Sequence, residues 1–129
     1  MTPGLFRLLI ALYLLCVVLA VVSHIATAAD LPEPLRVYVA AQDETSWMTG
    51  TGGMVYLALA SISTAGLLLF RRWARPLFAV VALAGCVPWD GATAYPPLEY
   101  LFVNLEFMLA GAVIASSWAP AVSARFMRR

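Results

Sequence analysis

The feature that most constrains this chain is a run of 21 residues from Leu8 to Ala28 that holds no Asp, Glu, Lys or Arg. At about 1.5 Å per helical residue, a run of this length spans a hydrocarbon core of about 30 Å. Lipid offers no hydrogen-bond partners, so a backbone that crosses it must satisfy its own polar groups, which favours a helix. We therefore predict an uncleaved transmembrane helix over residues 8–28.

A cleavable secretory signal is the alternative interpretation of the same N-terminal residues. Arg7, the apolar run and the small residues near position 28 follow the order of such a signal. The apolar core of a signal is usually about 7–15 residues long, however, which is shorter than the run observed here. The length favours a retained helix, and the sequence alone leaves cleavage within residues 1–28 open.

Three further apolar runs follow, at residues 53–70, 72–89 and 98–118. Hydrophobic residues make up 63% of the chain and charged residues 12%, whereas a soluble domain carries roughly 45–50% and about 25%. A soluble domain of this size cannot bury so much apolar surface. The runs also lack the alternation of β-barrel strands. We therefore predict one all-α membrane domain over residues 1–129, a bundle of four transmembrane helices.

All eight basic residues are arginines, and four spans would place seven of them on one side of the membrane. These topology anchors are Arg7, Arg71, Arg72, Arg75, Arg125, Arg128 and Arg129. Basic residues gather on the cytoplasmic side, so we expect both termini, the basic turn 71–75 and the tail 119–129 in the cytoplasm. Outer loops then cover residues 29–52 and 90–97. The expected location is the bacterial cytoplasmic (inner) membrane, with several passes.

The first outer loop, residues 29–52, is compatible with two local structures. Residues 35–39 alternate between apolar and polar side chains as a short strand does. Pro32 and Pro34, followed by an alanine-rich stretch, instead suit the start of a helix. We predict a short helix that lies in the membrane interface.

Glu106 is the most informative residue for function, because it lies near the middle of the 98–118 run and hence of the bilayer. A charge at that depth costs roughly 2.5–3.5 kcal/mol or more, which makes intramembrane acids functional candidates. Glu99 lies seven residues earlier, on nearly the same helix face. His24 and Asp90 lie at a similar outer depth. We therefore expect an outer cluster of His24, Asp90 and Glu99 above Glu106, as in a proton or ion path.

A purely structural interpretation stands beside this proton path. In that interpretation Glu106 is protonated or bonded to neighbouring polar side chains, of which the candidates are Asn104, Ser61, Ser63 and Thr64. His24 is then an interface residue at a helix end. Asp90 and Glu99 are then solvated charges at loop ends.

Asn104 lies about 200° from Glu106 around a helix, so the two side chains face different neighbours. One of them is expected to meet another subunit or a partner membrane protein. Small residues four positions apart allow helices to approach closely. The packing candidates of this kind are Ser61 with Ala65, and Gly111 with Ala115.

The sequence contains no recognisable catalytic constellation. It has one histidine, and Cys16 and Cys86 form no metal-binding pair, so neither bis-histidine haem ligation nor a zinc site is supported. Glycine-rich phosphate loops and serine nucleophile motifs are missing as well. A net charge of +1 gives no reason to expect nucleic acid as a partner. We therefore predict a non-enzymatic protein without cofactor or metal ion.

Two segments carry a resemblance to other proteins: Arg71–Phe78, with the sequence RRWARPLF, and Gly111–Phe126, with the sequence GAVIASSWAPAVSARF. They resemble small four-helix inner-membrane proteins of bacteria that have no assigned activity. The resemblance covers about a fifth of the chain. It implies the four-span architecture and no site or activity.

Three functions fit these observations. The leading expectation is an accessory or interaction subunit of a membrane assembly, in contact with the lipid bilayer and with another copy or another membrane protein. The first alternative is a small proton-coupled transporter or channel that uses Glu106, with His24, Asp90 and Glu99 at its outer mouth. An immunity or lysis-type membrane protein is the second alternative.

Overall fold

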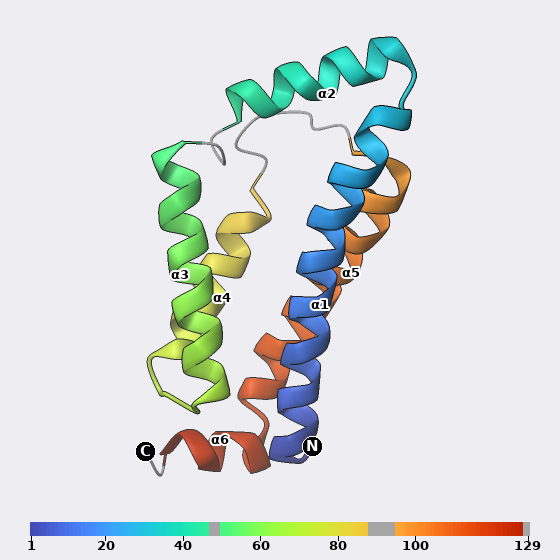
Figure 1. Cartoon of the computed structure of the whole chain (residues 1–129). Coiled ribbons are helices and arrows are strands. Elements are labelled where there is room, and N and C mark those ends of the chain that lie inside the picture. The colour runs from blue at the N-terminus through green and yellow to red at the C-terminus, as the bar shows by residue number, and fades with distance from the viewer. Residues whose placement is uncertain (47–49, 88–94, 128–129) are drawn as a thin grey trace.

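The computed structural model of the chain describes residues 1–46, 50–87 and 95–127 (Figure 1). Its elements are α1 Pro3–Thr27, the 3₁₀ turn η1 Ala28–Asp30, α2 Glu33–Thr45, α3 Thr51–Leu68, α4 Ala74–Gly85, α5 Pro97–Ser117 and α6 Pro120–Met127. All regular structure within the described residues is helical, so the predicted all-α class is confirmed there. Helices α1, α3 and α5 are long and apolar enough to cross a membrane, as expected of a membrane protein.

These three helices coincide with three of the predicted spans, at residues 8–28, 53–70 and 98–118. Helix α1 begins five residues before its predicted span because Thr2 caps it. The backbone N–H of Leu5 donates to Thr2 Oγ1 at 3.3 Å, and Pro3 in the first position has no N–H to satisfy. The local capping signal therefore extends this helix toward the N-terminus.

Helix α4 is shorter than the predicted third span of residues 72–89. Its 12 residues give about 18 Å of helix, against about 30 Å of hydrocarbon core. The turn that closes α3 delays its start to Ala74. After Gly85 the α-helix ends in a 3₁₀-type turn, in which the Cys86 N–H bonds to the carbonyl three positions earlier. Pro88 follows in the sequence and disfavours helical backbone at the residue before it.

Two shorter helices lie across the ends of the long ones (Figure 1). Helix α2 occupies part of the predicted outer loop 29–52, so the helical prediction is correct there and the strand alternative is wrong. Its position at a membrane interface stays a prediction. Helix α6 occupies residues predicted only as a tail, 119–129. Its Val122 and Phe126 are fully buried against the rest of the bundle, which explains why these residues are helical and docked.

The long helices form two pairs, in which α1 packs antiparallel along α5, and α3 packs along α4 (Figure 1). The pairs share one apolar core toward the end of the bundle that holds α6. The core consists of Phe6, Ile10, Tyr13, Leu67, Phe70, Ala74, Phe78, Ala110, Val113, Val122 and Phe126. Within it the rings of Phe6, Phe70 and Phe126 have centroids 5.2 to 6.1 Å apart. Aromatic packing therefore joins the two pairs at this end.

The turn after α3 directs one of these rings into the core. The Arg71 N–H donates to the Gly66 carbonyl at 2.8 Å, and the Phe70 N–H donates to the carbonyl three residues earlier at 3.0 Å, which is a Schellman cap. Phe70 occupies the left-handed position of this cap, with φ 54°, where glycine is usual. Its backbone strain is roughly 1–2 kcal/mol. Burial of the ring, which is 5% exposed, offsets that strain.

Two glycines allow α3 and α4 to approach. A Cβ at Gly66 would lie 2.6 Å from Ala74 Cβ and 2.8 Å from the Trp73 ring, and a Cβ at Gly85 would collide with the Tyr56 hydroxyl. The predicted packing residues lie elsewhere: Ser61, Ala65, Gly111 and Ala115 are exposed on this chain. Their role in contacts between chains stays a prediction, and the contacts within the chain use glycines that the spacing pattern did not indicate.

The arginines separate along the bundle. We call one end the basic end, because the start of α1, the α3–α4 turn and α6 meet there with Arg7, Arg71, Arg72, Arg75 and Arg125 (Figure 1). Arg36 lies on α2, across the opposite end. Arg128 and Arg129 lie outside the described residues. The first and last helices also meet at the basic end, where the ring centroids of Phe6 and Phe126 are 6.1 Å apart.

Candidate functional site

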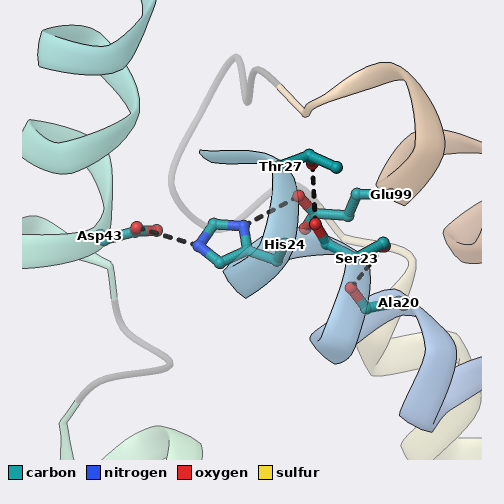
Figure 2. A network of polar contacts seen from close by, with 6 residues as sticks. All are labelled: Ala20, Ser23, His24, Thr27, Asp43 and Glu99. Carbon is teal, nitrogen blue, oxygen red and sulfur yellow. Dashed lines mark hydrogen bonds and ion pairs between the residues drawn. The ribbon is translucent and has the colours of Figure 1, made fainter. Parts of the chain in front are cut away.

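The polar cluster at the end of α1 is centred on His24 (Figure 2). Its Nδ1 lies 2.8 Å from Glu99 Oε2, and its Nε2 lies 3.3 Å from Asp43 Oδ2. A neutral imidazole has one N–H and can donate to one carboxylate, whereas an imidazolium has two and can donate to both. The geometry therefore suits a protonated His24 held between two carboxylates.

Three elements that are distant in the sequence supply the cluster. His24 lies in the last turn of α1, Glu99 in the first turn of α5, and Asp43 near the end of α2. The antiparallel packing of α1 and α5 places the first two turns side by side, and α2 crosses above them (Figure 1). The exposed fraction of the side chain rises from 11% for Glu99 to 30% for His24 and 50% for Asp43. The cluster therefore runs from the protein interior to its surface.

Hydroxyl groups near His24 are satisfied within α1. Ser23 Oγ donates to the Ala20 carbonyl at 2.8 Å, and Thr27 Oγ1 donates to the Ser23 carbonyl at 2.7 Å (Figure 2). These hydroxyl groups donate to the backbone and therefore do not donate to Glu99. In Figure 2 the Glu99 carboxylate contacts the imidazole of His24.

Glu106 lies deeper in the bundle, on the same face of α5 as Glu99 and about 10 Å further along the helix. Its side chain is half-buried. Two phenol groups, those of Tyr13 on α1 and Tyr56 on α3, lie near enough to feel a charge on Glu106. Glu106 thus lies near phenol groups from both helix pairs.

The structure brings together two of the three residues predicted at the outer mouth, His24 and Glu99. Asp90 lies outside the described residues. Asp43 joins the cluster without having been indicated by the sequence. The sequence predicted a short helix within residues 29–52 without fixing its bounds, which leaves the direction of its side chains undefined. Helical periodicity over residues 33–45 was the one signal that could have placed Asp43 on a defined face.

Three of the predicted polar partners of Glu106, which are Ser63, Thr64 and Asn104, bond to backbone carbonyls of their own helices. Thr64 Oγ1 donates to the Ala60 carbonyl at 2.8 Å, and Asn104 Nδ2 donates to the Tyr100 carbonyl at 2.7 Å. Asn104 and Ser61 are exposed. Asn104 therefore lies on the outer face of α5, while Glu106 is directed inward.

Cys16 and Cys86 are free thiols in this structure. Over residues 1–46, 50–87 and 95–127, no group of three or more His, Cys, Asp and Glu side chains is arranged to hold a metal ion. The titratable groups of the candidate site are therefore the His24 imidazole, the carboxylates around it and at Glu106, and the phenols near Glu106.

In comparisons with known proteins, no family model, no curated protein and no solved structure matches this chain. Its function must therefore be inferred from the His24 cluster, from Glu106 and from the distribution of charge.

Proposed function

We propose that this protein is a small proton-coupled transporter or channel. His24 and Glu99 form the outer proton-binding group, and Glu106 forms the inner one. The observation that carries the proposal is the 2.8 Å contact between His24 and Glu99, two helical turns above an acid on the same face of α5. Ionisable residues within membrane helices commonly mark proton or ion pathways.

The membrane arrangement we propose has four crossings. Helices α1, α3 and α5 are the long ones, and α4 with its flanking residues is the fourth. An even number keeps the arginines of the basic end on one side, which by the positive-inside rule is the cytoplasm of a bacterium. The His24 cluster then faces outward. The packing of α4 along α3 supports this assignment, because a helix beside a membrane span shares its environment.

The chemistry of the outer group follows from the imidazole. One ring nitrogen can accept a proton from outside while the other releases its proton to Glu99, because the two nitrogens face two different carboxylates. Glu99 and Glu106 are separated by about 10 Å along α5, which a single hydrogen bond cannot cover. Proton transfer between them therefore requires intervening water molecules.

Proton flux into liposomes tests this proposal. The full chain is reconstituted with an internal pH dye, and a potassium diffusion potential is applied. We expect flux from the wild-type protein and its loss in Glu106→Gln. Glu44→Gln is the matched control, since Glu44 lies on α2, is exposed and is not part of the cluster. Equal flux from the wild-type protein and Glu106→Gln would contradict the proposal.

A second function, an accessory subunit of a membrane assembly, is favoured by Asn104. Its amide lies on an exposed face of α5, together with Leu101, which is 52% exposed, and Met108, which is 72% exposed. Amide side chains on membrane helices hydrogen-bond across helix interfaces. Crosslinking in native membranes tests this function: wild-type adducts that disappear in Asn104→Leu are expected, and a stable monomer without adducts argues against it.

A further inference from the structure

A small pocket lies at the basic end, between the start of α1, the α3–α4 turn and α6. Its volume is about 170 Å³, and it is lined by Pro3, Arg7, Phe70 and Arg125. Two arginines from opposite ends of the chain thus line one pocket, and its lining contains no carboxylate.

The positive charge at the basic end is not balanced by acids among the described residues. Both ion pairs within the described ranges involve His24, at the opposite end of the bundle. The acidic residue closest in sequence to any arginine of the basic end is Asp90, 15 positions after Arg75, and it lies outside the described residues. Like charges gathered without counter-charges repel one another, so a bound anion would stabilise this end.

Two of the neighbouring arginines have a structural task. Arg72 donates to the backbone carbonyls of Phe126, at 3.1 Å, and of Met127. Arg75 Nη2 donates to the carbonyl and the hydroxyl of Ser123, at 3.1 Å each, and its guanidinium lies 4.1 Å from the centroid of the Phe126 ring. These contacts hold α6 in place and thereby form one wall of the pocket.

Arg7 and Arg125 are differently engaged. The Arg7 guanidinium lies 5.2 Å from the centroid of the Phe70 ring and makes one long hydrogen bond, of 3.5 Å, to the Leu68 carbonyl. Stacking on a ring leaves the N–H groups at the edge of a guanidinium able to donate. Arg125 is exposed and, within the part of the chain that the structure describes, has no hydrogen-bond or ion-pair partner. Both side chains therefore retain donors for a ligand.

We propose that this pocket binds a phosphate group, which accepts hydrogen bonds from Arg7 and Arg125 while the Phe70 ring positions Arg7. The forked donors of arginine match phosphate oxygens. In the proposed membrane arrangement, on which this inference rests, the pocket lies at the level of lipid headgroups, and basic pockets between helices bind anionic headgroups. The headgroup of an anionic phospholipid therefore supplies the phosphate.

Lipid binding to the purified full chain tests this site. The protein in neutral detergent is titrated with phosphatidylglycerol, phosphatidylcholine or inorganic phosphate, and binding is followed by native mass spectrometry and by the thermal unfolding midpoint. We expect phosphatidylglycerol to bind and to raise the midpoint, and phosphatidylcholine to do neither. Removal of one basic residue near an anionic surface corresponds to a loss of about fivefold, so Arg7→Gln with Arg125→Gln should weaken binding about thirtyfold.

The matched control also removes two charges, by Arg71→Gln with Arg36→Gln. Arg71 belongs to the basic end but does not line the pocket, and this variant should bind as the wild type does. A midpoint in phosphatidylcholine close to that of the wild type shows that a variant is folded. Arg7→Lys with Arg125→Lys retains the charge without the forked donors and should bind with intermediate affinity.

The outcomes distinguish the two sources of the phosphate and can overturn the site. If inorganic phosphate raises the midpoint in an Arg7- and Arg125-dependent way and lipid adds nothing, the pocket stands and its ligand is a soluble phosphate. If the control variant weakens lipid binding as much as the pocket variant does, the attraction is diffuse and the site is overturned. Unchanged lipid binding in the pocket variant overturns it as well.

Discussion

His24 Nδ1 and Glu99 Oε2 lie 2.8 Å apart although 75 positions separate the two residues in the sequence. The contact joins the end of α1 to the start of α5. The second nitrogen of the same ring reaches Asp43 on α2. One imidazole thus connects three helices, and its protonation state decides how many of these connections are hydrogen bonds.

The position of α2 should depend on pH. The titratable groups in contact with His24 are the carboxylates of Asp43 and Glu99, so the imidazolium donates to both and the neutral ring to one. The stabilisation is present while the ring is protonated and is lost as rising pH removes its proton. After correction for intrinsic exchange rates, the protection of the α2 amides should therefore be constant below about pH 6.5, the ordinary pKa of histidine, and fall as the pH rises above it.

His24→Gln provides the control for this pH dependence, because a glutamine side chain does not titrate. The α2 amides of this variant should exchange at a protection level independent of pH, after correction for intrinsic exchange rates. Equal pH dependence in this variant and the wild-type protein would show that another group controls α2.

A double-mutant cycle should detect the pairing of His24 with Glu99. Replacement of each residue by glutamine, alone and together, gives a coupling energy of about 1 kcal/mol, because the pair is charge-assisted but partly exposed. Unfolding in mixed micelles measures it. A control cycle that pairs His24 with Glu44, an exposed residue of α2, should give a coupling energy near zero.

Alanine at Gly66 should destabilise the α3–α4 pair by roughly 1–3 kcal/mol, because the new Cβ would lie 2.6 Å from Ala74 Cβ. Gly111→Ala is the matched control, since nothing lies within 4 Å of a Cβ at that position. Thermal unfolding in detergent compares the two variants. Equal midpoints for both would contradict the close approach of the helices at Gly66.

Phe126→Ala should release α6 from the basic end. The Phe126 side chain is fully buried and contacts the rings of Phe6 and Phe70, so its removal costs roughly 3–5 kcal/mol of packing. Limited proteolysis should then cleave the C-terminal segment faster. Met127→Ala, at a residue that is 61% exposed, should leave the cleavage rate unchanged.

The long helices could be predicted from the sequence because their signal is local: uninterrupted apolar residues over the thickness of a bilayer. The shared face of Glu99 and Glu106 follows from helical periodicity alone. Asp43 could not be assigned to the cluster, because its contact with His24 depends on how α2 crosses the bundle. The late start of α4 could not be predicted either. The turn before it ends α3 with a left-handed Phe70, at a position where glycine is usual, so the sequence does not show this turn.

The arginines illustrate the same limit. Their sidedness could be predicted by counting charges between apolar runs. Sequence does not show that Arg72 and Arg75 bond to α6, nor that Arg7 lies over the Phe70 ring. The contacts of Arg72 and Arg75 depend on the helical structure of the C-terminal segment, which burial of Val122 and Phe126 stabilises.

Phe70 belongs at once to the closing turn of α3, to the aromatic contact between the helix pairs and to the wall of the pocket at the basic end. Anion binding in the pocket and the association of the two helix pairs are therefore thermodynamically linked. An anion held there should make the two helix pairs harder to separate, and by linkage separation of the pairs should weaken anion binding by the same factor. The lipid composition around the protein would then act on the geometry of the whole bundle.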